Sequence, residues 1–174
     1  MAADARGAPL PWIVEWADLI APGALVLDLA AGGGRHALFF AERGHTVVAV
    51  DRDTSRLPAH PNIEPLVADL EDGSPWPVDR RFGAVVVTNY LHRPLMPALL
   101  ESIEPGGVLL YQTFMEGNER FGKPRRPEYL LRDGELLELV RDRFSVTAYE
   151  ARLLSDPTAP RMAMVQRIAA RRLR

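Results

Sequence analysis

The sequence predicts an α/β protein with a doubly wound, mainly parallel sheet. Short apolar runs alternate with helical patterns along the chain, with turn residues between them, as is typical of parallel sheets connected by helices. Three consecutive glycines follow the first apolar run, where such a sheet turns from a strand into a helix. The last two predicted strands are separated by only about ten residues, too few for a parallel crossover. We therefore expect this final pair to form an antiparallel hairpin.

The first half of the chain predicts a strand–helix–strand unit, preceded by one helix. Leu10 to Ile20 has apolar residues at helical spacing and predicts an amphipathic helix, which Pro22-Gly23 ends. Two apolar, valine-containing runs predict buried strands, and the segment between them predicts a helix that ends at Gly44. The expected strands are residues 24–29 and 46–50, and the expected helix is residues 36–43.

The second half of the chain predicts less regular units. Residues 71–81 contain a glycine and two prolines and predict a loop, where a longer helix would be usual. The Pro-Gly-Gly sequence at 105–107 predicts a turn before the fifth strand. The remaining expected strands are 63–67, 84–88, 108–113, 145–151 and 161–170, and the remaining helices are 94–103 and a segment within 130–144. We expect one domain over residues 1–174, with residues 1–22 as a helical segment before a core at 23–174.

Composition narrows the classes of function. The chain has 174 residues, 47% hydrophobic and 25% charged, with a formal net charge of −2 and no cysteine. The missing cysteines exclude disulfides, thiolate metal sites and a cysteine nucleophile. The histidines lack the spacing of a metal site, so no metal is expected, and the charge argues against a generally basic nucleic-acid binder. With no run of about 20 apolar residues and no signal peptide, we expect a cytoplasmic protein without membrane contact.

The segment from Asp28 to Gly34 is the main functional motif of the sequence. It lies between a predicted strand and a predicted helix, at the edge where parallel sheets bind ligands. Glycines there allow unusual backbone angles and let a ligand approach the main chain. Gly32, Gly34 and Ala37 also match the loose dinucleotide pattern G-x-G-x-x-G/A. An NAD(P)-binding oxidoreductase is therefore one alternative, and a structural turn without a ligand is another.

Three carboxylates separate these possibilities. Asp28 lies at the end of the first strand, where its charge would repel the pyrophosphate of a dinucleotide but suits the sulfonium and ammonium groups of S-adenosylmethionine. Asp51 ends the second strand, where it can accept both ribose hydroxyl protons. Asp69 follows the third strand and can accept a hydrogen bond from an adenine amino group. Carboxylates at three adjacent strand ends therefore predict a nucleoside site.

Here the sequence resembles the class I S-adenosylmethionine-dependent methyltransferases. The resemblance is most specific over Asp28-Leu29-Ala30-Ala31-Gly32-Gly33-Gly34-Arg35 and the segment from Gly44 to Asp51, and it extends to Asp69-Leu70, Val85 to Tyr90 and Pro105-Gly106-Gly107. Similar members are the small bacterial tellurite-resistance-like and thiopurine-methyltransferase-like proteins. The resemblance implies a Rossmann-like, seven-stranded sheet whose last strand is antiparallel, with S-adenosylmethionine as cofactor and S-adenosylhomocysteine as product.

The resemblance also implies the residues that hold the cofactor. Asp28 and the glycine loop would hold the methionine moiety, Asp51 the ribose and Asp69-Leu70 the adenine. Ala30 stands where the family often has glycine. The full set of expected cofactor contacts is Asp28, Ala30, Gly32, Gly34, Arg35, Asp51, Arg52, Asp69, Leu70, Asn89 and Leu91.

The segment after the fourth strand, Thr88 to Arg93, is where the chemistry is expected. Methyl transfer is a direct in-line displacement, in which alignment and exclusion of water supply most of the rate. His92 is the candidate base if the acceptor must lose a proton, because histidine exchanges protons near neutral pH. Tyr90 is the candidate for orienting the acceptor. A histidine before a helix also often caps or packs, so a non-catalytic cofactor-binding module is a further alternative.

The expected acceptor is a small molecule, because the chain has no large insertion to cover a protein substrate. The segment from Met115 to Tyr129 contains four cations and two aromatic residues, which suits an anionic acceptor, and a solvated loop is the alternative. Nucleic acid is not expected, since no second basic patch with aromatic residues is present. The acceptor atom and the oligomeric state stay open. The expected substrate contacts are Arg93, Arg120, Arg125 and Arg126.

Overall fold

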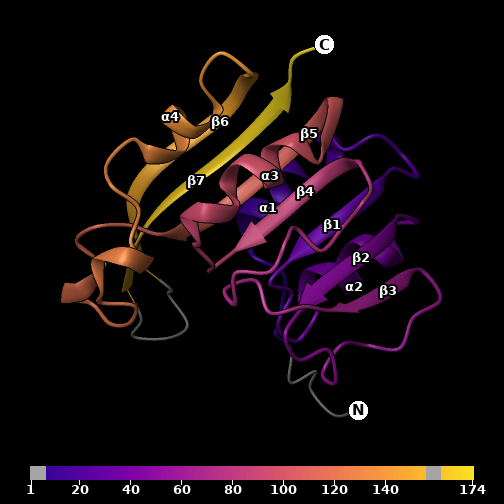
Figure 1. The fold of residues 1–174 in the computed structure, drawn as a ribbon. Coiled ribbons are helices and arrows are strands. Elements are labelled where there is room, and N and C mark those ends of the chain that lie inside the picture. The colour runs from indigo at the N-terminus through magenta and orange to yellow at the C-terminus, as the bar shows by residue number, and fades with distance from the viewer. Residues whose placement is uncertain (1–6, 156–161) are drawn as a thin grey trace.

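A seven-stranded sheet forms the centre of the computed structural model, which describes residues 7–155 and 162–174 (Figure 1). The strand order is β3-β2-β1-β4-β5-β7-β6. Strands β1 to β5 pair in parallel, and β7 is antiparallel to both of its neighbours, β5 and β6. The expected sheet with an antiparallel last strand is therefore confirmed. The strands are β1 (Leu25–Leu29), β2 (Thr46–Asp51), β3 (Ile63–Val67), β4 (Phe82–Thr88), β5 (Ile103–Phe114), β6 (Phe144–Ser155) and β7 (Met162–Arg172).

In the part of the chain that the structure describes, four short α-helices cover the two faces of the sheet. Helices α1 (Pro11–Trp16) and α2 (Arg35–Glu42) pack on one face, and α3 (Met96–Glu101) and α4 (Glu135–Val140) pack on the other (Figure 1). Single 3₁₀ turns occur at residues 17–19, 93–95, 118–120 and 127–129. Within the described ranges, each helix is too short or too polar to cross a membrane.

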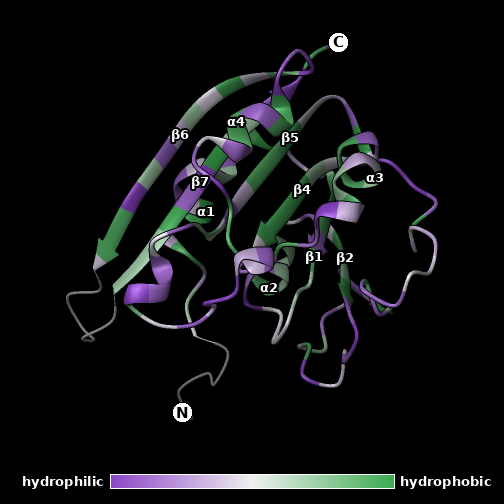
Figure 2. Ribbon diagram, turned by 60° about the vertical axis from the view of Figure 1, so that its left-hand side comes forward, coloured by the Kyte–Doolittle hydropathy of each residue, from purple (hydrophilic) through white to green (hydrophobic). Residues whose placement is uncertain are grey.

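The central strands are buried on both faces, which explains their nearly continuous apolar sequence. Alternate side chains of a strand point to opposite faces. In β1, Leu27 and Leu29 pack in the layer of α3 and α4, whereas Val26 packs in the layer of α1 and α2. Figure 2 shows the corresponding hydrophobic colour along β1 and β4. Covering helices on both sides are the usual setting for parallel strands.

The Pro-Gly-Gly sequence at 105–107 lies within β5, rather than in a turn before it. The register between β4 and β5 shifts from Phe82 opposite Ile103 to Ala84 opposite Val108, so the chain bulges between these pairs. Gly107 is required by close packing, because a Cβ atom there would lie 2.8 Å from Ile103 Cγ2. The predicted turn is thus a bulge in a longer strand.

Other differences from the predicted elements arise where segments contact distant strands. The helix expected within 130–144 is present as α4, and it begins only after Leu131 has bridged to Met115 and Gly134 has taken a left-handed φ of 69°. Residues 71–81 form a loop, as predicted. The last hairpin has longer strands than expected. Arg161 and residues 1–6, which the sequence placed in the last strand and the N-terminal segment, lie outside the described residues.

Candidate cofactor and acceptor site

The glycine loop between β1 and α2 is fastened to the end of β2. Gly32 donates its backbone N–H to Asp51 Oδ2 at 2.8 Å, and Ala31 donates to the carbonyl of Val50 at 3.0 Å. The other carboxylate oxygen of Asp51 accepts from the Asp53 N–H at 3.1 Å. Because neighbouring parallel strands end at the same edge, Asp51 is brought next to the loop and orders it.

Three residues of this loop have a left-handed backbone: Ala30 with φ 56°, Gly32 with φ 56° and Gly34 with φ 75°. Such angles favour glycine, because a Cβ atom crowds the backbone there. At Gly34 a Cβ atom would also lie 2.7 Å from side-chain atoms of both Leu57 and Pro58. Ala30 adopts this conformation although it is not glycine.

Asp28 lies beneath the loop, 1% exposed. Its Oδ2 atom is buried without a hydrogen-bond partner among the described residues. Burial raises the pKa of Asp28 to about 7, although a hydrogen bond from the Ala37 backbone N–H and the charge of Arg35 both act to lower it. A buried carboxylate with an unused oxygen is costly in this position. A positively charged group bound above it would lower that cost.

His36, which the sequence analysis assigned no role, joins three segments around the site. Its Nε2 accepts the backbone N–H of Leu10 at 3.1 Å, and its Nδ1 lies 3.3 Å from Thr88 Oγ1 at the end of β4. Burial and the nearby charge of Arg35 lower the pKa of His36 to about 3, so the ring is neutral. An accepting Nε2 then places the proton on Nδ1, facing Thr88.

A cavity of about 490 Å³ opens at the ends of β2, β3 and β4. Several of the expected site residues line it, with carboxylates from two strand ends and an aromatic ring after β4. Tyr129, which belongs to the segment expected near the acceptor, also lines it, and so does Glu71, to which the sequence gave no role. The full lining is Ala30, Asp51, Arg52, Ala68, Asp69, Leu70, Glu71, Tyr90 and Tyr129.

Other expected cofactor and catalytic residues do not line this cavity. Leu91 is 5% exposed and belongs to the core. Asn89 is exposed, with a left-handed φ of 54°, and its backbone N–H donates to the carbonyl of Gln112 at 2.9 Å. Arg35 points its Nη1 to the carbonyl of Ala8 at 3.5 Å. His92 is half-buried just before the 3₁₀ turn at 93–95. Gly32, Gly34 and Asp28 are also absent from the lining.

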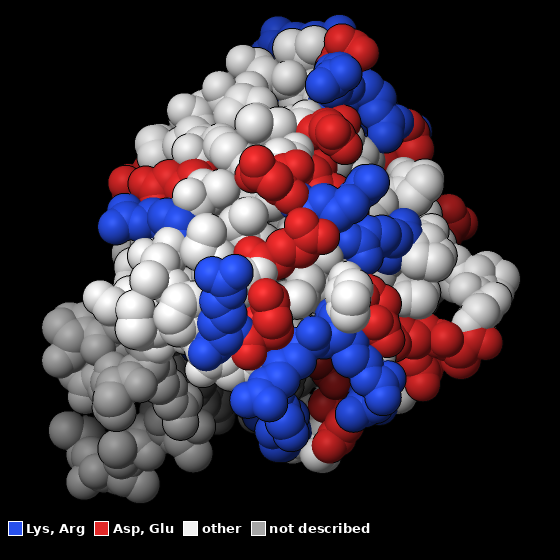
Figure 3. Space-filling view, turned by 90° about the vertical axis from the view of Figure 1, so that its left-hand side faces the viewer, with Lys and Arg blue, Asp and Glu red and all other residues white. Residues whose placement is uncertain are grey.

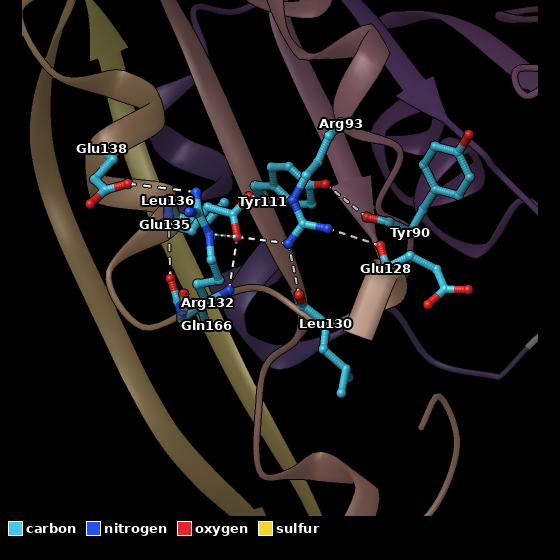
Figure 4. Close-up of polar contacts among 10 residues, drawn as sticks. All are labelled: Tyr90, Arg93, Tyr111, Glu128, Leu130, Arg132, Glu135, Leu136, Glu138 and Gln166. Carbon is cyan, nitrogen blue, oxygen red and sulfur yellow. Dashed lines mark hydrogen bonds and ion pairs between the residues drawn. The ribbon is translucent and has the colours of Figure 1, made fainter. Parts of the chain in front are cut away.

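Arg93 was expected to contact the substrate, but in the structure its guanidinium is hydrogen-bonded to other residues of the protein. Nε and Nη2 donate to the two carboxylate oxygens of Glu135 at 2.7 and 2.8 Å. Nη1 donates to the carbonyl of Glu128 at 3.0 Å, and Nη2 donates to the carbonyl of Leu130 at 2.8 Å (Figure 4). Arg93 is not in the lining of the cavity, and its donors hold another part of the chain.

The remaining expected substrate contacts lie on exposed loops away from the cavity lining. Arg120 lines a separate shallow cavity with Phe121, and Arg126 pairs with Glu128 at 3.7 Å. Arg125 is exposed. Figure 3 shows basic and acidic side chains interspersed over the face that carries α4 and β6. The cavity itself is rich in carboxylates, so it does not favour the anionic acceptor that the sequence suggested.

Comparisons with known proteins relate this chain to methyltransferases. No protein-family model matches the chain. A Synechocystis sp. protein described as an uncharacterized methyltransferase is 33% identical over 104 residues, and the match covers 51% of this chain and 46% of the relative. The chain thus matches about half the length of this relative.

Solved structures of low sequence identity share the fold. TehB from Haemophilus influenzae superposes with a TM-score of 0.70 at 20% identity, covering 93% of this chain and 61% of that chain. The 1,6-didemethyltoxoflavin-N1-methyltransferase of Burkholderia thailandensis, solved with S-adenosylhomocysteine, has a TM-score of 0.62 at 19% identity, covering 94% of this chain and 77% of that one. With this sheet order and these neighbours, the chain has the fold of the class I S-adenosylmethionine-dependent methyltransferases.

Proposed function

We propose that the chain is an S-adenosylmethionine-dependent methyltransferase that acts on a small-molecule acceptor. One observation carries this proposal. Asp51 from the end of β2 and Asp69 from the segment after β3 line the same cavity as Ala30 of the glycine loop, and the buried carboxylate of Asp28 lies beneath that loop. This set offers a separate partner to each polar part of the cofactor.

The residues present fit the cofactor in their chemistry. The carboxylate of Asp51 suits a ribose diol, and Asp69 with Leu70 suits the adenine. The unused buried oxygen of Asp28 is consistent with a cationic ligand, because a nearby positive charge stabilises an ionised carboxylate. A dinucleotide pyrophosphate at the same place would face like charge. These contacts support S-adenosylmethionine over NAD(P).

The chain contributes binding, orientation and exclusion of water to the proposed reaction. When bound, S-adenosylmethionine would supply a methyl group on a sulfonium, with S-adenosylhomocysteine as the thioether product, and the acceptor would supply a lone pair aligned with the carbon–sulfur bond. Tyr90 provides aromatic surface in the cavity that can orient an acceptor. His92 follows Tyr90 by two residues and is the proposed receiver of a proton if the acceptor loses one.

A neutral or cationic small molecule suits the lining better than an anionic one. Glu71, which the cofactor does not use, adds a third carboxylate to those of Asp51 and Asp69 around the cavity, against the single arginine Arg52, and like charges repel. The Burkholderia neighbour is named as a methyltransferase of 1,6-didemethyltoxoflavin, which supports an acceptor of small size.

Calorimetric titration of the full chain with S-adenosylhomocysteine tests the proposed cofactor. We expect saturable binding by the natural sequence and a loss of about 10- to 100-fold in affinity for Asp51→Asn, because hydrogen bonds to a charged group are strong. Asp53→Asn is the matched control. Its carboxylate makes the same kind of local turn, to the Ser55 N–H at 3.0 Å, and it does not line the cavity.

Three outcomes would contradict the proposal. Absence of S-adenosylhomocysteine binding at millimolar concentration excludes the cofactor assignment. Greater thermal stabilisation by NAD or NADP than by S-adenosylhomocysteine assigns the site to a dinucleotide instead, since a ligand that binds the folded state raises the melting temperature. Binding without methylated product in cell extracts points to a non-catalytic module.

A further inference from the structure

Tyr129 reaches the cavity from a part of the chain that is far in sequence from its other lining residues. It ends the 3₁₀ turn at 127–129, which follows β5. Its side chain is 39% exposed and lines the cavity together with Asp51 and Asp69. A half-exposed aromatic ring on an exposed loop needs a restraint if it is to stay at a binding site, because loop segments otherwise lose entropy when a ligand orders them.

Arg93 supplies such a restraint. Its guanidinium donates to the carbonyl of Glu128 at 3.0 Å and to the carbonyl of Leu130 at 2.8 Å. Figure 4 shows Arg93 between Glu128 and Leu130. These two residues precede and follow Tyr129 in the sequence, so one side chain holds the backbone on both sides of the tyrosine. Arg93 itself begins the 3₁₀ turn after β4, close to Tyr90 in sequence.

Glu135 fixes the orientation of Arg93. The carboxylate, whose side chain is 13% exposed, accepts from Nε and Nη2 of Arg93 and also from the backbone N–H of Arg132 at 2.8 Å. A planar guanidinium in a two-point contact with a carboxylate has a fixed plane, which aims its remaining donors. A lysine ammonium keeps the charge but cannot reproduce this geometry.

The far end of the network is anchored in the sheet. Gln166 of β7 is fully buried, and it accepts from the Leu136 N–H at 3.2 Å and donates to the carbonyl of Arg132. Leu131 donates its backbone N–H to the carbonyl of Phe114 on β5 at 3.0 Å. The residues after Tyr129 are thereby tied to two strands.

We propose that Tyr129 covers the nucleoside part of the bound cofactor and that Arg93, held by Glu135, is the residue that positions it. This inference rests on the proposed function, since it takes S-adenosylmethionine as the occupant of the cavity. The contact is made by the aromatic ring, which has the face to pack on a purine or ribose. Arg93 acts through Tyr129 and touches no ligand atom.

A double-mutant cycle on S-adenosylhomocysteine affinity tests the inference, with calorimetry on the full chain. We expect Tyr129→Ala to weaken binding about 10-fold and Tyr129→Phe to retain it within about 3-fold, because the ring is kept. Arg93→Lys is expected to weaken binding by several-fold in the natural background. In the Tyr129→Ala background the same Arg93→Lys change should have little further effect, because Arg93 affects the ligand only through the ring of Tyr129, which this background lacks.

The control is Arg143→Lys, the same chemical change in an exposed arginine that pairs with Glu101 at 2.6 Å, away from the cavity. It should leave the affinity unchanged. Additive effects of Arg93→Lys and Tyr129→Ala, or an unchanged affinity in Tyr129→Ala, overturn the inference. Circular dichroism identifies a variant that fails to fold, and Tyr129→Leu, which removes the ring but keeps an apolar side chain, then replaces Tyr129→Ala in the cycle. Failure of the natural sequence to bind S-adenosylhomocysteine contradicts the proposed function instead.

Discussion

The two sides of the cavity are built in different ways. On the side of β1 to β3, the glycine loop and Asp51 meet because parallel strands end at a common edge, and the contacts are mostly with the backbone. On the side of Tyr129, an arginine after β4 reaches a carboxylate 42 residues away and two carbonyls 35 and 37 residues away. One side follows from the strand register, and the other depends on specific side-chain pairs.

The electrostatics of the two sides differ as well. Asp28 is buried with an unused oxygen, and burial raises its pKa. For Glu135, burial also acts to raise the pKa, but the hydrogen bonds from Arg93 and from the Arg132 N–H outweigh it, so the pKa lies below its ordinary value. A buried carboxylate with one oxygen left without a partner lowers stability in favour of ligand binding, whereas one with both oxygens paired stabilises the fold.

The largest expected effect is a gain in stability from Asp28→Asn at alkaline pH. The raised pKa means that the Asp28 carboxyl group holds its proton more tightly in the folded chain than in the unfolded chain. The contribution of this protonated group to the free energy of unfolding is therefore complete below pH 4 and is lost as pH rises from about 4 to about 7. At pH 8 we expect the variant to have a higher free energy of unfolding, by as much as about 4 kcal/mol, from about 1.4 kcal/mol per pKa unit.

Urea denaturation at pH 5, 6, 7 and 8 measures this difference. The gain should shrink as the pH is lowered, and the same variant should bind S-adenosylhomocysteine more weakly. Asp69→Asn, at the exposed neighbouring site, should change the free energy of unfolding by no more than about 0.5 kcal/mol. A pH-independent effect of Asp28→Asn would show that the buried carboxylate carries no such penalty.

Gly34→Ala should destabilise the fold by about 3 kcal/mol, which combines a left-handed φ with crowding. The added Cβ atom would lie 2.7 Å from atoms of Leu57 and Pro58. Gly32→Ala is the matched control, since its φ is also left-handed but nothing lies within 4 Å of the added atom. Its cost should be about 1 kcal/mol. Equal urea midpoints for the two variants would indicate that the crowding at Gly34 is relieved.

Glu135→Gln should lower the free energy of unfolding by about 2 kcal/mol at pH 7, because it removes the charge that pairs with Arg93. The lowered pKa of Glu135 sets the sign of the pH dependence. The contribution of the ionised Glu135 carboxylate to the free energy of unfolding is complete above the ordinary carboxyl pKa and is lost as pH falls below that value. Urea titrations of both proteins should therefore converge in acid, and a constant difference down to pH 3 would contradict the role of the pair.

The smallest expected effect is a modest stabilisation by Ala30→Gly, of about 0.5 kcal/mol. Ala30 has a left-handed φ of 56°, and glycine relieves this strain but loses more entropy on folding. Ala31→Gly, at a buried neighbouring position, is the control and should destabilise instead. Thermal melting of both variants measures the difference, and a lower melting temperature for Ala30→Gly would mean that the alanine methyl group packs favourably.

The sequence by itself determined the sheet class, the first strand–helix–strand unit and the positions of Asp28, Asp51 and Asp69. These features are local, since they follow from the period of side chains along a strand, from turn residues and from where each strand ends. Parallel strands then bring their carboxyl ends together without further information. The cavity lining includes Asp51 and Asp69 for this reason.

Only the tertiary structure decided the use of Arg93, the place of Tyr129 and the length of α4. From the sequence, an arginine near an expected site can equally well contact a ligand or pair with an acidic residue of the protein. Arg93 pairs with Glu135, which is distant in sequence, and only the structure shows this. His36 was likewise assigned by its contacts with Leu10 and Thr88. Such contacts join segments tens of residues apart, and no local periodicity or spacing encodes the distance between them.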